Sequence, residues 1–339
     1  MPYTITELLG DGISTELSES VRRILKVLPV DIELEPVDLS LENRSKRGPG
    51  LYEEAYTSIH KNRYALKYPT TTTNESPNAI LRKLCKFSVI HRPVFTIPGV
   101  ESNFKGNLDI DIVRVATGGT YEDPGRMIGT EAAVSIRIIE RRPCEEAALY
   151  AFYLARKLKK SVTSSSKYTI QSVTDGLFQI IVSEITQQFP DVPHTKELFD
   201  ALLAKLVMFP ERFGVILVLN EYGDFISDMA CGLVGSMGIG GSGSYAFNAN
   251  QEITLAMFDP AGGTAPDIAG KNLVNPTAIF IATTLLLQQL GELHSSEALK
   301  KATLQCLSKG QRTRDLGGNL TTSEFTDCVA RTCLEILNH

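Results

Sequence analysis

The sequence predicts an α/β protein. Apolar, strand-like runs alternate along the chain with amphipathic helices, and this alternation is typical of the class. The clearest unit is the apolar run at 215–219, which is followed after two residues by an amphipathic helix. A chain of 339 residues with 43% hydrophobic content is also long enough for two sizeable lobes that share one or two cores.

The elements follow in order from the N-terminus, where a first strand enters a Gly-Asp-Gly turn at 10–12. Further strands are predicted at 32–37, 111–115 and 215–219, with 132–139 as a candidate strand. Apolar residues at helical spacing predict helices after 221 and at 16–27, 77–85, 145–158, 176–188, 195–209 and 275–290. The helix at 275–290 is apolar enough to be buried but too short to cross a membrane. Residues 238–247 are rich in glycine and predict a loop.

The composition excludes several kinds of partner. The net charge is −5 and the 22% of charged residues are mixed in sign, so we expect neither a nucleic-acid-binding nor a membrane-binding surface. The six cysteines form no CxxC pair and no Cys/His cluster, which favours a reducing compartment and argues against zinc and disulfides. No signal peptide or arginine-rich presequence is recognisable, so we expect a cytoplasmic protein, or a matured organellar one.

Two acids stand at the start of the helix that follows the 215–219 strand. Asp224 and Asp228 are four residues apart, so they lie on one face of that helix. Their charges repel each other unless a cation or a basic group lies between them, and carboxylate oxygens suit Mg²⁺ or Mn²⁺. A solvated helix start explains the same pattern, because acids also favour the positive end of the helix dipole.

Three arginines form a second group of polar residues. Arg82 lies in the helix predicted at 77–85, Arg92 precedes a proline, and Arg114 lies near the end of a predicted strand. Guanidinium groups bind carboxylates in a bidentate manner, and Ser76 and Asn78 would add hydrogen-bonding groups beside them. Each arginine alone fits a surface residue, but three of them in a chain with an acid pair indicate an anion-binding site.

A glycine pattern at 238–243 matches GxGxxG without predicting a dinucleotide site. The Rossmann fingerprint requires a strand before the glycines, a helix after them and an acid about 20 residues further on. Here a helix precedes the pattern and the polar, aromatic run at 244–250 follows it.

These motifs together resemble the β-decarboxylating dehydrogenase family, which includes isocitrate, homoisocitrate, 3-isopropylmalate and tartrate/D-malate dehydrogenases. The similarity runs nearly end to end, from the turn at 10–12 to 322–327, and the pattern is closest to NAD-dependent isocitrate dehydrogenase. The matching motifs are Ser-x-Asn-x-x-x-Arg at 76–82, His-Arg-Pro at 91–93, Arg114 through Tyr121, Lys167 before Asp175-Gly-Leu-Phe, 222–228, and 263–271 with Asn275-Pro276.

The resemblance implies two open α/β domains, which do not form a classical Rossmann fold, with the active site in the cleft between them. The large cofactor-binding domain would comprise 1–100 and 250–339. The small domain, 101–249, would carry the dimer interface and the metal site. The resemblance also implies a homodimer with shared active sites, so that a monomer is inactive.

The resemblance assigns roles to individual residues. A small hydroxy-acid substrate would be bound by Ser76, Asn78, Arg82, Arg92 and Arg114. The metal, Mg²⁺ or Mn²⁺, would be held by Asp224, Asp228 and, from the neighbouring subunit, Asp200. The neighbouring subunit's Lys167 would help to deprotonate the substrate hydroxyl, and Tyr121 would protonate the enol that remains after CO2 leaves. Without the family, a surface lysine and a packing tyrosine are the simpler interpretations.

The implied cofactor is NAD. Its contacts would come from Thr72, Gly263, Thr264, Ala265, Asp267 and Asn275. A carboxylate at Asp267 accepts hydrogen bonds from a ribose 2′-hydroxyl and repels a 2′-phosphate, which favours NAD over NADP. The implied reaction is metal-dependent oxidative decarboxylation of a 3-substituted (R)-malate, with isocitrate, converted to 2-oxoglutarate, as the first candidate. The alternatives are homoisocitrate, 3-isopropylmalate, and tartrate or D-malate.

The chain departs from the family pattern at several positions. Gly262 replaces a histidine near the cofactor, Val115 replaces a glutamate, Ser14-Thr15 replace a Gly-Pro pair, and the loop at 73–75 is short. These changes concern cofactor affinity and turnover, and they leave the competing hypothesis of a non-catalytic regulatory subunit. Non-catalytic relatives usually lose the metal aspartates, the lysine or the tyrosine. This chain keeps them all, so the sequence predicts an enzyme.

Overall fold

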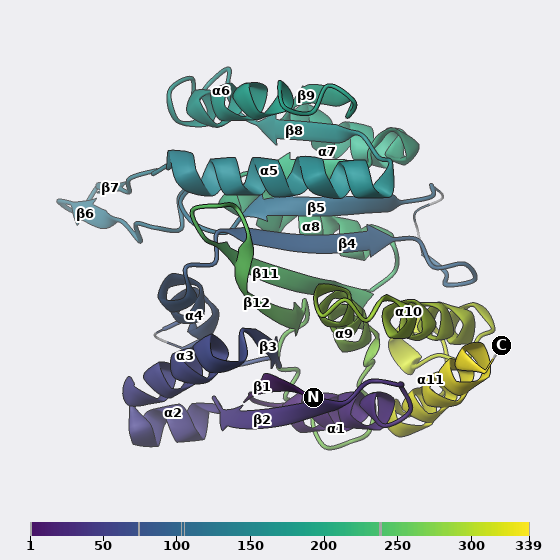
Figure 1. The fold of residues 1–339 in the computed structure, drawn as a ribbon. Coiled ribbons are helices and arrows are strands. Elements are labelled where there is room, and N and C mark those ends of the chain that lie inside the picture. The colour runs from purple at the N-terminus through teal and green to yellow at the C-terminus, as the bar shows by residue number, and fades with distance from the viewer. Residues whose placement is uncertain (1, 74, 103, 105, 237–238, 339) are drawn as a thin grey trace.

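The protein is described here from a computed structural model that covers residues 2–73, 75–102, 104, 106–236 and 239–338. Within these residues a sheet of ten strands runs through the molecule in the order β2-β1-β3-β12-β11-β4-β5-β10-β8-β9 (Figure 1). The strands are β1 (Tyr3–Leu9), β2 (Ile32–Asp38), β3 (Tyr64–Lys67), β4 (Val89–Phe95), β5 (Asp109–Val115), β8 (Val162–Ser166), β9 (His194–Leu198), β10 (Val215–Val218), β11 (Gly241–Phe247) and β12 (Ile253–Pro260). A separate hairpin is formed by β6 (Arg126–Ile128) and β7 (Ala132–Val134).

The two ends of the sheet are parallel and its centre is antiparallel. β4 pairs antiparallel with both β5 and β11, and β11 pairs antiparallel with β12. β3 is parallel to β12, so the first and the last parts of the chain share one half of the sheet. The middle part, from β4 to β10, forms most of the other half (Figure 1).

Helices cover both faces of the sheet (Figure 1). They are α1 (Ser14–Leu25), α2 (Leu41–Arg47), α3 (Gly50–Asn62), α4 (Pro77–Cys85), α5 (Arg141–Leu158), α6 (Thr174–Thr186), α7 (Phe199–Met208), α8 (Asn220–Leu233), α9 (Thr277–Gln289), α10 (Leu293–Ser308) and α11 (Thr322–Leu337). The main hydrophobic core extends through both halves of the sheet, and a smaller core lies under α3 and α4. No helix in the described residues is long and apolar enough to cross a membrane.

Local sequence explains the two helices that position the site. At α4 the Ser76 hydroxyl accepts a hydrogen bond from the Ala79 amide at 3.3 Å, and Pro77 occupies the first turn, where its missing amide costs nothing. α8 follows β10 directly, because the fully buried Val215–Val218 run ends at a sheet edge where the chain must turn. α8 therefore begins at the end of a central strand, and α4 ends shortly before the central strand β4 begins.

Most predicted elements are confirmed, and α4 has the predicted bounds. Three predictions were wrong. The helix expected at 195–209 begins only at Phe199, because 195–198 pair with β8 as part of β9. Of the strand expected at 132–139, only Ala132–Val134 is a strand. The loop expected at 238–247 is largely β11, while Gly238 itself lies outside the described residues. The domain boundaries stay a prediction.

Candidate active site

A cavity of about 270 Å³ lies where α4, β4, β5 and α8 meet β12. The three arginines predicted as substrate ligands all line it: Arg82 comes from α4, Arg92 from β4 and Arg114 from β5. Asp224 and Asp228 line it from α8. The structure therefore brings together the arginine group and the acid pair, which lie far apart in the chain.

Arg114 is the most buried of the three arginines. Its Nε donates to Asn220 Oδ1 at 2.9 Å, and its Nη1 donates to Asp224 Oδ1. Asn220 in turn donates to the Gly118 carbonyl at 2.9 Å, which ties the guanidinium to the turn after β5. Burial and the neighbouring Arg82 lower the pKa of Arg114 to about 10. The side chain is thus a cation held in place for an anionic ligand.

Arg82 and Arg92 have hydrogen-bonding capacity to spare. Arg92 Nη1 donates to Ser227 Oγ at 2.7 Å and to Asp228 Oδ1 at 3.2 Å, but its buried Nε has no partner among the described residues. The Arg82 guanidinium makes no hydrogen bond or ion pair with any described residue, and burial lowers its pKa. An unpaired buried donor is costly, so Arg92 Nε indicates a ligand that accepts hydrogen bonds here, and the unengaged Arg82 guanidinium is available to the same ligand.

The acid pair lies on one face of α8, as predicted. Each carboxylate contacts an arginine: Asp224 contacts Arg114, and Asp228 contacts Arg92. Burial would raise the pKa of Asp224, but Arg114 and the Tyr121 hydroxyl outweigh burial and hold it below its ordinary value. Asp224 is therefore available as a carboxylate ligand for a cation, and Asp228 faces the same cavity.

Oxygen-only donors fit a hard divalent ion, but two carboxylates from one chain are an incomplete set. No group of three or more His, Cys, Asp or Glu that could hold a metal occurs within the described residues. The remaining donors would have to come from substrate oxygens and a second chain. Asp224 and Asp228 thus fit the predicted metal as two of its ligands.

Tyr121 also lies beside the cavity. Its hydroxyl donates to Asp224 Oδ2 at 3.1 Å, and Arg114 lies 6.0 Å from its ring centroid. Burial, followed by the Asp224 charge, raises the pKa of this tyrosine, so it remains protonated at neutral pH. A protonated phenol beside the acid pair is suited to donating a proton.

The two polar residues predicted at the start of α4 differ in their surroundings. Ser76 caps the helix. Asn78 lines the cavity, and its buried Oδ1 has no partner among the described residues. The apolar residues that follow face elsewhere, because Leu81 is buried in the smaller core and Ile80 packs against it. A polar amide therefore faces the ligand from this helix.

Lys167 and Asp200 are not part of this cavity. Lys167 Nζ donates to Asp200 Oδ1 at 2.6 Å, and this hydrogen bond lowers the pKa of Asp200. The backbone amide of Lys167 donates to the fully buried Asp175 at 2.7 Å, which fixes the turn between β8 and α6. The family resemblance predicts that both residues contribute to the active site of the neighbouring subunit. Such residues lie away from the cavity of their own chain, and this is where the structure places them.

The segment predicted to bind the cofactor connects β12 to α9. Gly262 and Gly263 line the arginine cavity, Asp267 is exposed, and Asn275 donates to Asp315 Oδ2 at 2.9 Å. Thr72 and Asp267 make no side-chain hydrogen bond with any described residue, so both are free for a ligand. Ala265 has a positive φ of 37°. The loop thus lines the cavity with Gly262 and Gly263, and the Asp267 carboxylate is exposed to solvent.

Substituting Gly12 is expected to weaken cofactor binding. Gly12 has φ +57°, and a Cβ there would lie 1.9 Å from the carbonyl oxygen of Thr264, to which the Ile13 amide donates at 3.0 Å. In Gly12→Ala the cofactor loop must move, and we expect the KM for NAD to rise roughly tenfold or more. Gly310→Ala has a similar φ of +79° with open space around it, so its KM should not change. Equal effects in steady-state assays would contradict this account.

Sequence reasoning missed three contributors to the cavity. Lys67 is buried in β3, donates to the Tyr68 carbonyl at 2.9 Å, and has its pKa lowered to about 8 by burial. Asp259 of β12 faces the same cavity and accepts from Ser242 at 2.6 Å. Asn220 positions Arg114, as described above. A lysine inside the otherwise apolar run 64–68 is the signal that could have identified Lys67.

Fold and site together define an α/β protein with a mixed sheet and a cavity that is lined by three arginines and a pair of aspartates. The family model "isocitrate/isopropylmalate dehydrogenase" matches residues 4–329. Relatives include a regulatory chain of the mitochondrial NAD isocitrate dehydrogenase of Dictyostelium discoideum (34% identical, 98% of this chain and 93% of that protein covered). A 3-isopropylmalate dehydrogenase of Archaeoglobus fulgidus is also 34% identical, with 96% and 98% covered.

A solved structure agrees with this match. The crystal structure of isocitrate dehydrogenase from Methylococcus capsulatus superposes with a TM-score of 0.90 at 28% identity, covering 98% of this chain and 99% of that chain. The chain belongs to the isocitrate/isopropylmalate dehydrogenase family. The predicted family and fold are confirmed, as is the prediction of a dehydrogenase of this family.

Proposed function

We propose that the protein catalyses metal-dependent oxidative decarboxylation of a 3-substituted (R)-malate with NAD, with isocitrate as the first candidate. The observation that carries this proposal is the single cavity that combines three arginines with the Asp224–Asp228 pair. The unpaired groups on Arg82, Arg92 and Asn78 are those that a polycarboxylate would satisfy. The NAD isocitrate dehydrogenases among the relatives support the choice of cofactor and substrate.

In this proposal each residue has a separate task. The arginines hold the substrate carboxylates, and the partner subunit's Lys167 accepts the proton of the C2 hydroxyl as hydride leaves C2 for NAD. Asp224 and Asp228 would hold a divalent ion, which supplies Lewis-acid polarisation of the new carbonyl. The bond between C3 and its carboxylate then breaks, and CO2 leaves its electron pair on the enolate. Tyr121 gives its proton to C3, which is consistent with its raised pKa.

A homodimer is part of the proposal. Large apolar side chains are exposed on the hairpin, in the turn before α6, and on α6, α7 and α8, namely Met127, Ile128, Ile170, Val173, Ile180, Val207, Met208 and Phe225. Exposed large apolar side chains in this number are typical of a protein interface. A second copy seated here would cover it and complete the shared active site. The cytoplasmic location stays a prediction, since the relatives include mitochondrial proteins.

A second cavity favours homoisocitrate as the second candidate. It has a volume of about 660 Å³ and shares Arg82 and Tyr121 with the active site. Its walls include Phe87 and the buried Ser88 hydroxyl, which has no partner among the described residues. The remaining lining is mixed in charge, with the basic Lys83, Lys86 and Arg142 and the acidic Glu122, Glu140 and Glu146. A C3 substituent one methylene longer than that of isocitrate would have room there, and its carboxylate would pair with one of the basic side chains.

The test is NADH formation by the purified protein with isocitrate, homoisocitrate, 3-isopropylmalate, D-malate and tartrate, each with NAD and NADP. We expect turnover of one of the tricarboxylates with NAD, activity that is lost with EDTA, and recovery on adding Mn²⁺ because the acid pair needs a cation. Turnover of 3-isopropylmalate alone would contradict the polar role of Asn78. Tight isocitrate binding without turnover would instead support a non-catalytic, regulatory role, which the Dictyostelium discoideum relative carries in its name.

A further inference from the structure

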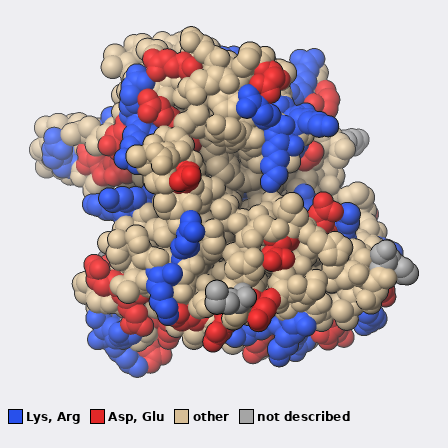
Figure 2. Space-filling view, viewed as in Figure 1, with Lys and Arg blue, Asp and Glu red and all other residues tan. Residues whose placement is uncertain are grey.

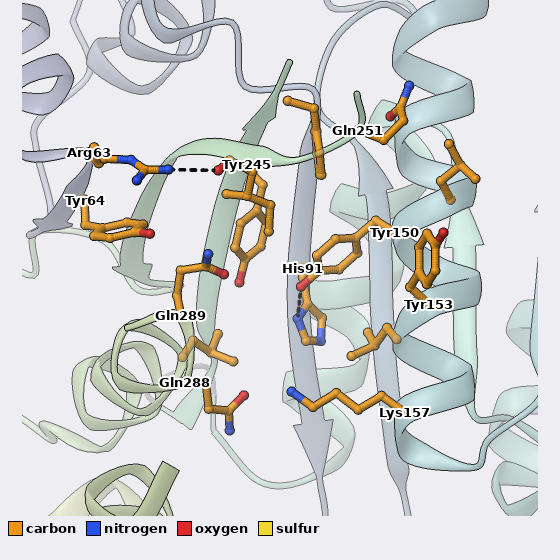
Figure 3. Close-up of a pocket in the computed structure, with 15 residues that line it drawn as sticks. Arg63, Tyr64, His91, Tyr150, Tyr153, Lys157, Tyr245, Gln251, Gln288 and Gln289 are labelled. Carbon is orange, nitrogen blue, oxygen red and sulfur yellow. Dashed lines mark hydrogen bonds between the residues drawn. The ribbon is translucent and has the colours of Figure 1, made fainter. Parts of the chain in front are cut away.

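A third cavity lies away from the arginines, between α5 on one side and β11, β12 and α9 on the other (Figure 3). Its volume is about 510 Å³. α5 belongs to the middle part of the chain, whereas β12 and α9 belong to the C-terminal part. The two walls therefore come from the two halves of the molecule, and no residue of the active-site cavity lines it.

Aromatic rings form much of the wall. Tyr150 stacks on Tyr245 with ring centroids 5.0 Å apart and an interplanar angle of 29°, and Phe247 meets Tyr150 edge-on at 6.4 Å. Tyr153, one turn further along α5, is 58% exposed, and Tyr64 of β3 lines the opposite margin of the cavity, with Tyr245 and Tyr150 between them (Figure 3). A slot with aromatic walls and one exposed ring suits a flat ring system that stacks between them.

The charge in this cavity has one sign. None of the described residues that line it is acidic, while Arg63 and Lys157 lie at opposite sides of it (Figure 3). Arg63 already donates to the carbonyls of Ile253 and Thr254 at 3.4 Å. The Lys157 ammonium makes no hydrogen bond or ion pair with any described residue. Figure 2 shows basic side chains over the C-terminal end of α5, above the groove between the two halves.

The floor of the cavity carries no free carboxylate among the residues that the structure describes. His91 Nδ1 contacts the Tyr150 hydroxyl at 3.1 Å, and His91 Nε2 contacts Asp111 at 2.8 Å. Asp111 also accepts from Lys160 at 2.9 Å, so both of its oxygens are occupied behind the histidine. These contacts fix the Tyr150 ring. Neither Arg63 nor Lys157 has an acidic partner among the described residues, and Lys157 is the one whose donors are unused.

We propose that this cavity binds a small planar aromatic carboxylate, whose ring stacks on Tyr150 and Tyr153 and whose carboxylate pairs with Lys157. Because α5 and α9 form opposite walls, a bound ring would contact both halves of the molecule. The site is separate from the dehydrogenase site, so the proposal does not depend on which acid the enzyme oxidises.

The probe is 1-naphthoate, with 1-naphthamide as its neutral isostere, and binding is measured by titration calorimetry on the full-length protein. We expect one site per chain and binding of the carboxylate roughly fivefold tighter than that of the amide, because one partly exposed ion pair distinguishes them. Saturating NAD and isocitrate should not displace either compound. Displacement, or equal affinity for the two compounds, would overturn the proposal.

Two variants and a control locate the site. Lys157→Gln should weaken naphthoate binding roughly fivefold and leave naphthamide binding unchanged, because only the carboxylate loses its partner. Tyr153→Ala should weaken both compounds. Lys309→Gln removes an exposed lysine at the end of α10, outside the cavity, and should change neither. Naphthoate affinity that is unchanged in both Lys157→Gln and Tyr153→Ala would place the compound elsewhere and refute the site.

Discussion

A mixed dimer of two inactive variants is expected to recover about half of the wild-type activity, since one of its two symmetric sites is intact. In the proposed dimer, Lys167→Met would remove the base that a chain gives to its partner, and Asp224→Asn would remove a metal ligand that a chain gives to its own site. Within one chain Lys167 Nζ donates a hydrogen bond to Asp200, and neither residue lines the arginine cavity. Each variant alone should lose activity at least roughly a hundredfold, as general acid–base and metal contributions are of that order.

The measurement uses two affinity tags on co-expressed chains, so that only the mixed dimer is purified and assayed. A dimer that pairs Lys167→Met with Asp200→Asn is the matched control. Both of those residues would be given to the partner, so each site of this dimer lacks one of them and no activity should return. Recovery in both pairings, or in neither, would show that the sites are not shared in this way.

Replacing Arg137 by methionine is expected to lower the free energy of unfolding much more than replacing a surface arginine does. Arg137 pairs with Asp175 at 2.9 Å and with Glu221, whose side chains are 0% and 5% exposed. It also lies 5.2 Å from the ring centroid of Tyr222. Without the guanidinium, two buried carboxylates lose their cation, and breaking such a pair costs about 3–5 kcal/mol.

Urea unfolding followed by circular dichroism measures this effect as a lower midpoint. Arg141→Met is the control, because Arg141 pairs with the exposed Glu184 and with Glu145, which lies only four residues further along the chain. Its midpoint should match that of the wild type. An Arg137→Met midpoint equal to that of the control would mean that the buried acids find other partners.

The elements that the sequence predicted well are those with strong local signals. Apolar residues at helical spacing predicted α4, which the structure begins with a Ser76 cap and Pro77 in its first turn, and the apolar run at 215–218 predicted β10 and the start of α8. β11 was missed because its first residues, Gly-Ser-Gly-Ser, have little strand propensity. They form a central strand because α9 packs closely on them: a Cβ at Gly241 would lie 2.6 Å from the Ala278 carbonyl and the Ala282 amide. Tertiary packing, which is not readable locally, decided that element.

The candidate site shows the same division. The spacing of Asp224 and Asp228 predicted a shared face, and the structure confirms it. The residue types alone indicated that the three arginines form an anion-binding site, but the pairing of β4 with β5, which brings Arg92 and Arg114 together, could not be read from them. Lys67 and Asn220 were missed because each is an ordinary residue type whose role comes from burial and from one hydrogen bond.

The pairing of β3 with β12 has a consequence for folding during synthesis on the ribosome. The first three strands are made early, yet their remaining neighbour in the sheet begins at Ile253, and α9, which packs on β3 and β12, follows at 277–289. Since contacts this distant in sequence form late, the part of the protein synthesised first is completed last. The apolar strands of the nascent N-terminal segment therefore stay without their neighbour β12 until nearly the whole chain has emerged, and they are exposed to aggregation during that time.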